Sequence, residues 1–128
     1  MIFKWLIKII FVLAFCLLFS CEGKADVCKD ASGYSCGQIV DAIYIIEGGK
    51  NTSYPYGIQS VKCDSLAECR QVCFNTVKNN VARWQKARQE GYKEGYLTFL
   101  WYRYCPPSAH PLNQNWKRNL LNQLEKAK

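Results

Sequence analysis

Residues 41–59 read DAIYIIEGGKNTSYPYGIQ, and the interpretation of the whole chain starts from this stretch. Apolar residues at positions 39, 40, 43 and 46 recur at helical spacing, which predicts a short buried helix that starts near Gly37 and ends near Glu47. The Gly-Gly pair at 48–49 follows at once, as is typical after the last turn of a helix. A turn with the sequence Tyr-Pro-Tyr-Gly at 54–57 then brings aromatic rings back towards Glu47.

This placement predicts a poorly solvated carboxyl group at Glu47. Loss of hydration disfavours the charged form, so we expect the pKa of Glu47 to be raised and the group to be protonated near neutral pH. Proteins build a general acid that breaks a glycosidic bond in this way. A glutamate before a glycine stop is also typical of an ordinary solvated helix end, so the burial of Glu47 discriminates between the two interpretations.

The first residues predict an export signal. Lys4 and Lys8 give a basic start, and an apolar run of about eleven residues follows, enough for a signal peptide but short of the ~20 needed to span a bilayer. Two cleavage sites compete: a lipoprotein signal 1–20, which leaves Cys21 acylated, or an ordinary signal peptide 1–25. Either route predicts a secreted or periplasmic protein, and the first would anchor it to a membrane through Cys21.

The cysteine content agrees with export. Six of the eight cysteines remain after either cleavage, and an even set in an oxidising compartment predicts up to three disulfides. Six cysteines allow many pairings; the one we expect is Cys28–Cys36, Cys63–Cys69 and Cys73–Cys105. A metal site on Cys63, Cys69 and Cys73 is disfavoured, because the paired Cys-x-x-Cys spacing and a nearby histidine are missing. No metal or cofactor is therefore predicted.

Residues 26–128 have the length of one domain with one core. Removal of residues 1–25 takes away three lysines and one glutamate, which lowers the net charge from +7 to +5. A moderately basic exported protein suits an anionic polymer such as a cell wall. The charges are dispersed, without a basic run or an RNA-binding aromatic motif, so nucleic acid is not the predicted partner.

The rest of the chain predicts a mainly α fold. A polar lead-in at 26–35 and a loop or weak hairpin at 50–61 flank the first helix. Ser65 and Glu68 form a capping box for a long helix that should run to about Gln89 and stop at Gly91. Further helices are expected at 92–104, rich in aromatic residues, and near the C-terminus with these side chains inward: Trp116, Leu120, Leu121 and Leu124. At most a small β element is predicted, beside Glu47.

Four motifs in this order resemble small secreted members of the lysozyme-like superfamily, nearest to goose-type lysozymes and soluble lytic transglycosylases. They are Glu-Gly-Gly at 47–49, Tyr-Pro-Tyr-Gly-Ile at 54–58, Cys-Phe-Asn-Thr at 73–76, and an aromatic helix that ends in Arg-Tyr-Cys-Pro at 103–106. The likeness extends roughly from Gln38 to Leu121. It implies a lysozyme-like helical domain, monomeric, that acts on the glycan strands of peptidoglycan.

The resemblance also implies roles for individual residues. Glu47 takes the place of the superfamily's glutamate at a helix end and would protonate the oxygen between N-acetylmuramic acid and N-acetylglucosamine. Either Tyr102 or Tyr104 would be the tyrosine that touches this acid, and the sequence leaves the choice open. Trp116 is a cleft or packing residue. The implied substrate-binding residues are Tyr54, Tyr56, Gly57, Gln59, Tyr102, Tyr104 and Asn113.

The chain departs from the family pattern in two places. Gly48 replaces the usual serine after the glutamate, and Gly57-Ile58-Gln59 is shorter than the usual Gly-Leu-Met-Gln. A second catalytic carboxylate is also lacking, since Asp41, Asp64 and Glu94 are poorly placed for the role. A lytic transglycosylase is therefore slightly favoured over a hydrolase. The substrate's own 6-hydroxyl or N-acetyl group would then replace the second carboxylate.

Two other classes of function compete with the enzyme. The chain could be a catalytically inactive lysozyme-like module that binds wall polymer or a part of a secretion apparatus. A cationic effector acting on membranes is disfavoured, because the last helix lacks a strongly cationic face.

Overall fold

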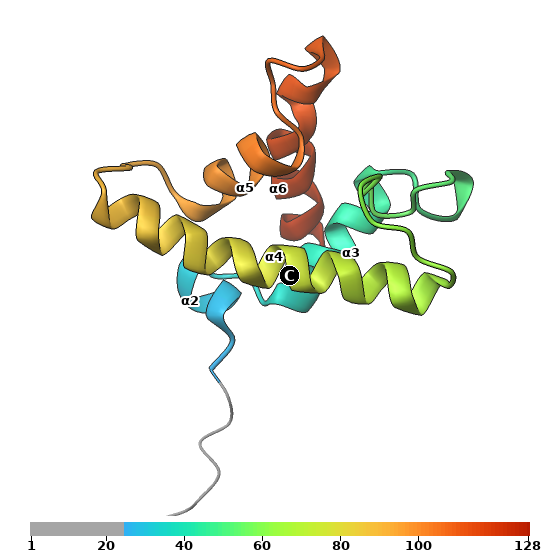
Figure 1. Ribbon diagram of the computed structural model, residues 1–128, viewed down its shortest axis with the longest axis horizontal. Coiled ribbons are helices and arrows are strands. Elements are labelled where there is room, and N and C mark those ends of the chain that lie inside the picture. The colour runs from blue at the N-terminus through green and yellow to red at the C-terminus, as the bar shows by residue number, and fades with distance from the viewer. Residues whose placement is uncertain (1–24) are drawn as a thin grey trace, which may run out of the picture.

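The computed structural model describes residues 25–128, so the predicted signal segment and Cys21 lie outside the described residues (Figure 1). Five α-helices and two short 3₁₀ helices make up this part of the chain: α2 (Val27–Ser32), α3 (Cys36–Ile46), η1 (Gly49–Asn51), α4 (Leu66–Gln89), α5 (Tyr96–Tyr104), η2 (Pro111–Asn115) and α6 (Trp116–Lys126). The mainly α, disulfide-stabilised class is thereby confirmed.

Residues 25–128 contain no strand, so the small β element expected beside Glu47 is absent. The glycines explain the difference. Gly48 and Gly57 have φ angles of 93° and 73°, in the left-handed region, and each turns the chain away from the extended conformation that a hairpin needs. The segment between α3 and α4 is instead an irregular loop that begins with η1.

The long helix α4 is the centre of the arrangement (Figure 1). Helix α3 packs against both α4 and α6, while α5 packs against α4 and α6. The loop between α3 and α4 lies at the N-terminal end of α4 in Figure 1. The fully buried side chains include Ile39, Ile43, Cys73, Val77, Tyr96, Leu100, Leu120 and Leu124. Helices that are far apart in the sequence therefore share one core, and the loop lies on this core.

The boundaries of α3 and α4 agree with the prediction. Helix α3 begins with a reciprocal capping box of Ser35 and Gln38. Helix α4 begins after the cap residue Ser65, but the predicted capping box is only half formed, because Glu68 accepts from the backbone N–H of Asp64 instead of Ser65. Helix α4 ends as the glycine signal indicates. Gly91 adopts a φ of 102°, and the backbone N–H of Tyr92 donates to the carbonyl of Ala87 at 2.9 Å, which satisfies one of the last helical carbonyls.

Two predicted boundaries are wrong. The polar lead-in contains the short helix α2, which Asp26 caps by accepting from the backbone N–H groups of Cys28 and Lys29. The aromatic helix begins at Tyr96 rather than at Tyr92, because Tyr92 still completes the end of α4 and Gly95 precedes α5 in an extended conformation. In α6, Trp116, Leu120 and Leu124 are buried as predicted, whereas Leu121 is only partly buried.

Two of the three expected disulfides are present. Cys28–Cys36 ties α2 to the start of α3, and Cys63–Cys69 ties the loop to the first turns of α4. The expected Cys73–Cys105 bond is wrong, because both residues are free thiols. Cys73 is fully buried on α4 with its sulfur 3.6 Å from the hydroxyl of Tyr104, whereas Cys105 lies at the partly exposed end of α5.

Candidate active site

Glu47 caps the C-terminus of α3. Its backbone N–H still donates to the carbonyl of Ile43 at 2.9 Å, and Gly48 then leaves the helix in the left-handed conformation. The helix is fixed in place by Ile39, Val40 and Ile43, which are fully buried. The side chain of Glu47 is partly buried, so it is neither a core residue nor a freely solvated one. A rigid helix end therefore positions this carboxyl group.

One oxygen of the Glu47 carboxyl group is held by an indole. The Nε1–H of Trp116 donates to Oε1 of Glu47 at 2.7 Å. Trp116 is the first residue of α6 and is 6% exposed, so the bond forms in a largely dry setting. A hydrogen bond typically contributes about 0.5–1.5 kcal/mol, which is enough to favour one orientation of the carboxyl group. Oε2 makes no hydrogen bond within the described residues.

The other side of the Glu47 carboxyl group is covered by the backbone of Gly57. A Cβ atom on Gly57 would lie 2.7 Å from both Cδ and Oε2 of Glu47, closer than real Cβ contacts come. The positive φ of Gly57 adds a second reason for glycine at this position. Gly57, which the resemblance implied as a substrate-binding residue, thus contacts the Glu47 carboxyl group itself.

Tyr104 links the loop to this pair. Its hydroxyl donates to the backbone carbonyl of Tyr56, the residue before Gly57, and its ring stacks on Trp116 with centroids 5.3 Å apart. Burial raises the pKa of the Tyr104 hydroxyl, so this group remains a donor. Beneath it, burial raises the pKa of the Cys73 thiol to about 11. The side chains of Tyr104 and Cys73 are therefore both uncharged at neutral pH.

An open depression of about 360 Å³ lies beside Gly57. Residues of the loop form one wall, and α4 and α5 supply the other. The residues that line it are Gly57, Ile58, Gln59, Ser60, Val61, Thr76, Arg103 and Tyr104. Glu47 itself is not part of this lining; Gly57 is the residue that both lines the depression and contacts the Glu47 carboxyl group. The walls of the depression combine apolar surface with a few polar groups, which is typical of small-molecule sites.

The structure brings four of the predicted site residues together. Glu47, Gly57, Gln59 and Tyr104 all lie at the carboxyl group or on the lining of the depression. Of the two tyrosines that the sequence left open, Tyr104 is the one stacked on Trp116, whereas Tyr102 is 55% exposed and lines a different depression.

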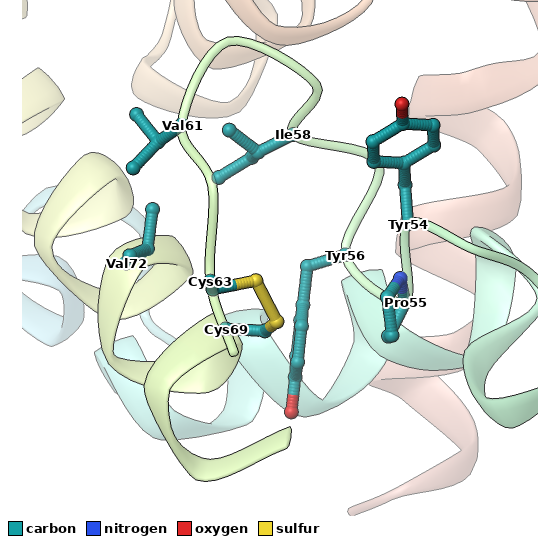
Figure 2. A pocket seen from close by; sticks show the side chains of 8 residues that line it. All are labelled: Tyr54, Pro55, Tyr56, Ile58, Val61, Cys63, Cys69 and Val72. Carbon is teal, nitrogen blue, oxygen red and sulfur yellow. A yellow bond between two sulfur atoms is a disulfide. The ribbon is translucent and has the colours of Figure 1, made fainter. Parts of the chain in front are cut away.

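The other predicted residues occupy supporting or separate positions. The ring of Tyr56 is buried, 5.2 Å from the ring of Tyr44, so only its backbone reaches the site. Tyr54 is 46% exposed and, with Tyr56, lines a small apolar pocket under the loop (Figure 2). Asn113 braces the segment before α6: its side-chain amide donates to the carbonyl of Pro106, and its own carbonyl accepts from Trp101.

Figure 2 also explains how the loop is held. The Cys63–Cys69 disulfide lies next to the ring of Tyr56, and Ile58, Val61 and Val72 line the same pocket. The disulfide and this apolar pocket thus fix on α4 the loop that carries Gly57.

One group of potential metal ligands occurs within residues 25–128, formed by Asp26, Cys28 and Cys36. The two sulfur atoms are bonded to each other, and the carboxylate of Asp26 accepts from backbone N–H groups of residues 28, 29 and 36. These atoms are therefore engaged in the fold, and we assign no metal to them.

Comparison with protein-family models, with curated proteins and with solved structures found no match for this chain. Within residues 25–128, no helix has both the length and the apolar character needed to cross a bilayer. A functional assignment consequently depends on the chemistry of the site and on the motifs of the sequence.

Proposed function

We propose that this protein is a secreted peptidoglycan glycosidase that cleaves the bond between N-acetylmuramic acid and N-acetylglucosamine, with Glu47 as the general acid. The observation that carries the proposal is the fixed carboxyl group of Glu47, held by Trp116 on one oxygen and covered by Gly57 beside an open depression. The order of motifs that resembles lysozyme-like proteins supports the same assignment.

The two oxygens of Glu47 have different surroundings, and this difference suits proton transfer. Oε1 accepts from the indole of Trp116, an N–H that cannot accept a proton in return. Oε2 lies beside Gly57 and has no hydrogen-bond partner among residues 25–128, so in this proposal it carries the transferable proton. A glycosidic oxygen bound against Oε2 would receive this proton as its bond to the anomeric carbon breaks.

The described residues offer no second carboxylate for the reaction. Asp41 pairs with Arg70 at 3.2 Å on the exposed face of α3, and Asp64 lies exposed before α4. Glu94 lines the other depression. This favours a lytic transglycosylase over a hydrolase. The 6-hydroxyl of the muramic acid would attack its own anomeric carbon, and its proton would return to the Glu47 carboxylate, giving a 1,6-anhydro product.

Mass spectrometry of the fragments released from purified peptidoglycan tests the proposal. We expect 1,6-anhydro muropeptides from the wild type and a loss of at least about a thousandfold in Glu47→Gln, since the amide cannot donate the required proton. Glu90→Gln is the matched control, because Glu90 is exposed at the end of α4.

The products discriminate between the alternatives. Reducing-end fragments that vanish in Glu47→Gln would identify a hydrolase with the same acid. A folded wild type that releases nothing from several wall types would contradict the enzyme. Binding to the wall without cleavage would then favour the inactive lysozyme-like module.

A further inference from the structure

A second depression, of about 580 Å³, adjoins the first one. Arg103 lines both, so its side chain forms the boundary between them. Helix α5 supplies most of this second depression, with contributions from the turn before it and from the start of α6. The lining residues are Tyr92, Glu94, Thr98, Phe99, Tyr102, Arg103 and Lys117. We call this the Arg103–Lys117 depression.

Its two cations are held in place by neutral partners. The Nε–H of Arg103 donates to Oδ1 of the buried Asn80 at 2.9 Å, and the guanidinium carbon lies 5.8 Å from the ring centroid of Phe99. The ammonium group of Lys117 donates to the hydroxyl of Thr98 at 2.6 Å. Neither cation forms an ion pair within residues 25–128. Both therefore keep their charge available to a ligand.

The walls between these cations are aromatic. The rings of Tyr92 and Phe99 meet edge to face with centroids 5.5 Å apart, and Tyr102 is 55% exposed. One carboxylate, Glu94, also lines the depression, but it lies beyond ion-pair distance of both cations. With two cations and one anion, the depression has an excess of one positive charge, which favours an anionic ligand with some apolar surface.

We propose that the Arg103–Lys117 depression binds the carboxylates of the peptide that branches from the glycan strand. This inference rests on the proposed function. In peptidoglycan, each muramic acid carries a short peptide whose free carboxylates are anionic. Because Arg103 lines both depressions, a strand bound in the first would bring its nearest peptide branch to the second. A guanidinium fork and an ammonium group match carboxylates at this point.

The test measures binding rather than cleavage, by calorimetric titration of the otherwise intact protein bearing Glu47→Gln, which prevents turnover. The first probe is the disaccharide N-acetylglucosaminyl-N-acetylmuramic acid carrying an alanyl-glutamate dipeptide. The second is the same compound with its carboxylates converted to amides. We expect the acid form to bind about tenfold more tightly than the amide.

Substitutions assign the effect to the two cations. Lys117→Gln should lower the affinity for the acid form by about tenfold and leave that for the amide within about twofold. Arg103→Gln should lower the affinity for the acid form by about tenfold and that for the amide by less, because Arg103 also lines the first depression. Lys117→Gln keeps the test decisive if Arg103→Gln disturbs Asn80. Glu94→Gln should strengthen binding of the acid form by about twofold, since it removes an opposing charge. Arg118→Gln is the matched control, because this exposed arginine of α6 bonds Asn115 instead.

The result that overturns the inference is equal binding of acid and amide, or an equal loss in Arg103→Gln, Lys117→Gln and Arg118→Gln. An equally strong response to inorganic phosphate alone would indicate a general anion site and would also contradict it. Failure of the proposed function gives a different result. If the wild type cleaves no peptidoglycan but the protein still prefers the acid form through Arg103 and Lys117, the carboxylate-binding site stands and the glycosidase proposal fails.

Discussion

The helices and the loop between α3 and α4 are held together in different ways. In the helical part, side chains such as Leu100 and Leu120 are fully buried, and the hydroxyl of Tyr96 donates to the carbonyl of Val77 inside the core. The loop has few such anchors: the buried ring of Tyr56, the contact of Gly57 with Glu47, and the Cys63–Cys69 disulfide. Stability therefore depends mainly on the helices, whereas the contact of Gly57 with the Glu47 carboxyl group depends on the loop.

The largest expected effect on folding comes from the helical part. Leu100→Ala removes a fully buried side chain between α5 and its neighbours and should lower the free energy of unfolding by about 2–5 kcal/mol. Urea unfolding followed by circular dichroism measures the loss. The matched control is Leu112→Ala, at a residue that is 71% exposed, which should change the value by less than about 0.5 kcal/mol. Similar losses in both variants would contradict the assignment of stability to the helical core.

A second effect concerns Cys73, which lies under Tyr104 where the helices meet the loop. Burial raises the pKa of its thiol from 9.0 to about 11. The native state then keeps a proton that the unfolded chain releases near pH 9, so the free energy of unfolding should fall as the pH rises from about 9 to 11. Two pKa units correspond to a total fall of about 3 kcal/mol at most.

Urea unfolding of the wild type and of Cys73→Ala across this pH range measures the contribution of the thiol. The variant should start less stable and lose less stability with pH. Burial also raises the pKa values of Tyr96 and Tyr104, but both proteins share these groups, so the difference in slope reports Cys73. Parallel pH profiles would contradict the prediction.

The smallest effect on folding and the most selective one on activity should come from the loop. Replacing both Cys63 and Cys69 by serine should cost about 2 kcal/mol, the amount expected for opening so short a covalent loop. Because Gly57 then loses its anchor, cleavage of peptidoglycan should fall by at least about tenfold at a temperature where the protein remains folded.

The other disulfide provides the control for that experiment. Cys28–Cys36 closes a chain segment of similar length but joins α2 to the start of α3, at the opposite end of that helix from Glu47. Its removal should cost a comparable free energy and leave cleavage nearly unchanged. Equal loss of activity in the two double variants would show that the loop has no special part in the site.

Much of the helical fold could be predicted, because its signals are local. Ser65 and Gly91 mark the two ends of α4, and both act there as the sequence indicates. Helix α2 was missed because its six residues are too few for a periodic pattern and its cap, Asp26, precedes a polar stretch. The start of α5 was misplaced because the ring of Tyr92 packs on Phe99 from outside the helix, which periodicity cannot distinguish from a helical neighbour.

The candidate site was predictable only in part, because several of its contacts join residues that are far apart in the sequence. Glu47 and Gly57 are ten positions apart, and the turn between them is visible in the sequence as glycines and Pro55. Trp116, which donates to Oε1 of Glu47, is 69 residues away in the sequence. The helical spacing of apolar residues around Trp116 indicated a core position as readily as a site position. Arg103 and Lys117 lie on different helices, so only the packing of α5 against α6 brings them to one depression.

The indole of Trp116 also makes the site optically accessible. Its N–H is bonded to Glu47 and its ring is stacked on Tyr104, so both neighbours of this fluorophore belong to the site. Trp84 and Trp101 donate instead to the backbone carbonyls of Glu94 and Asn113, so we expect the emission of these two indoles to change little when Glu47 is engaged. A sugar bound at the Glu47 carboxyl group changes the surroundings of this one indole and should alter its emission, so the unlabelled protein carries its own fluorescent reporter of occupancy.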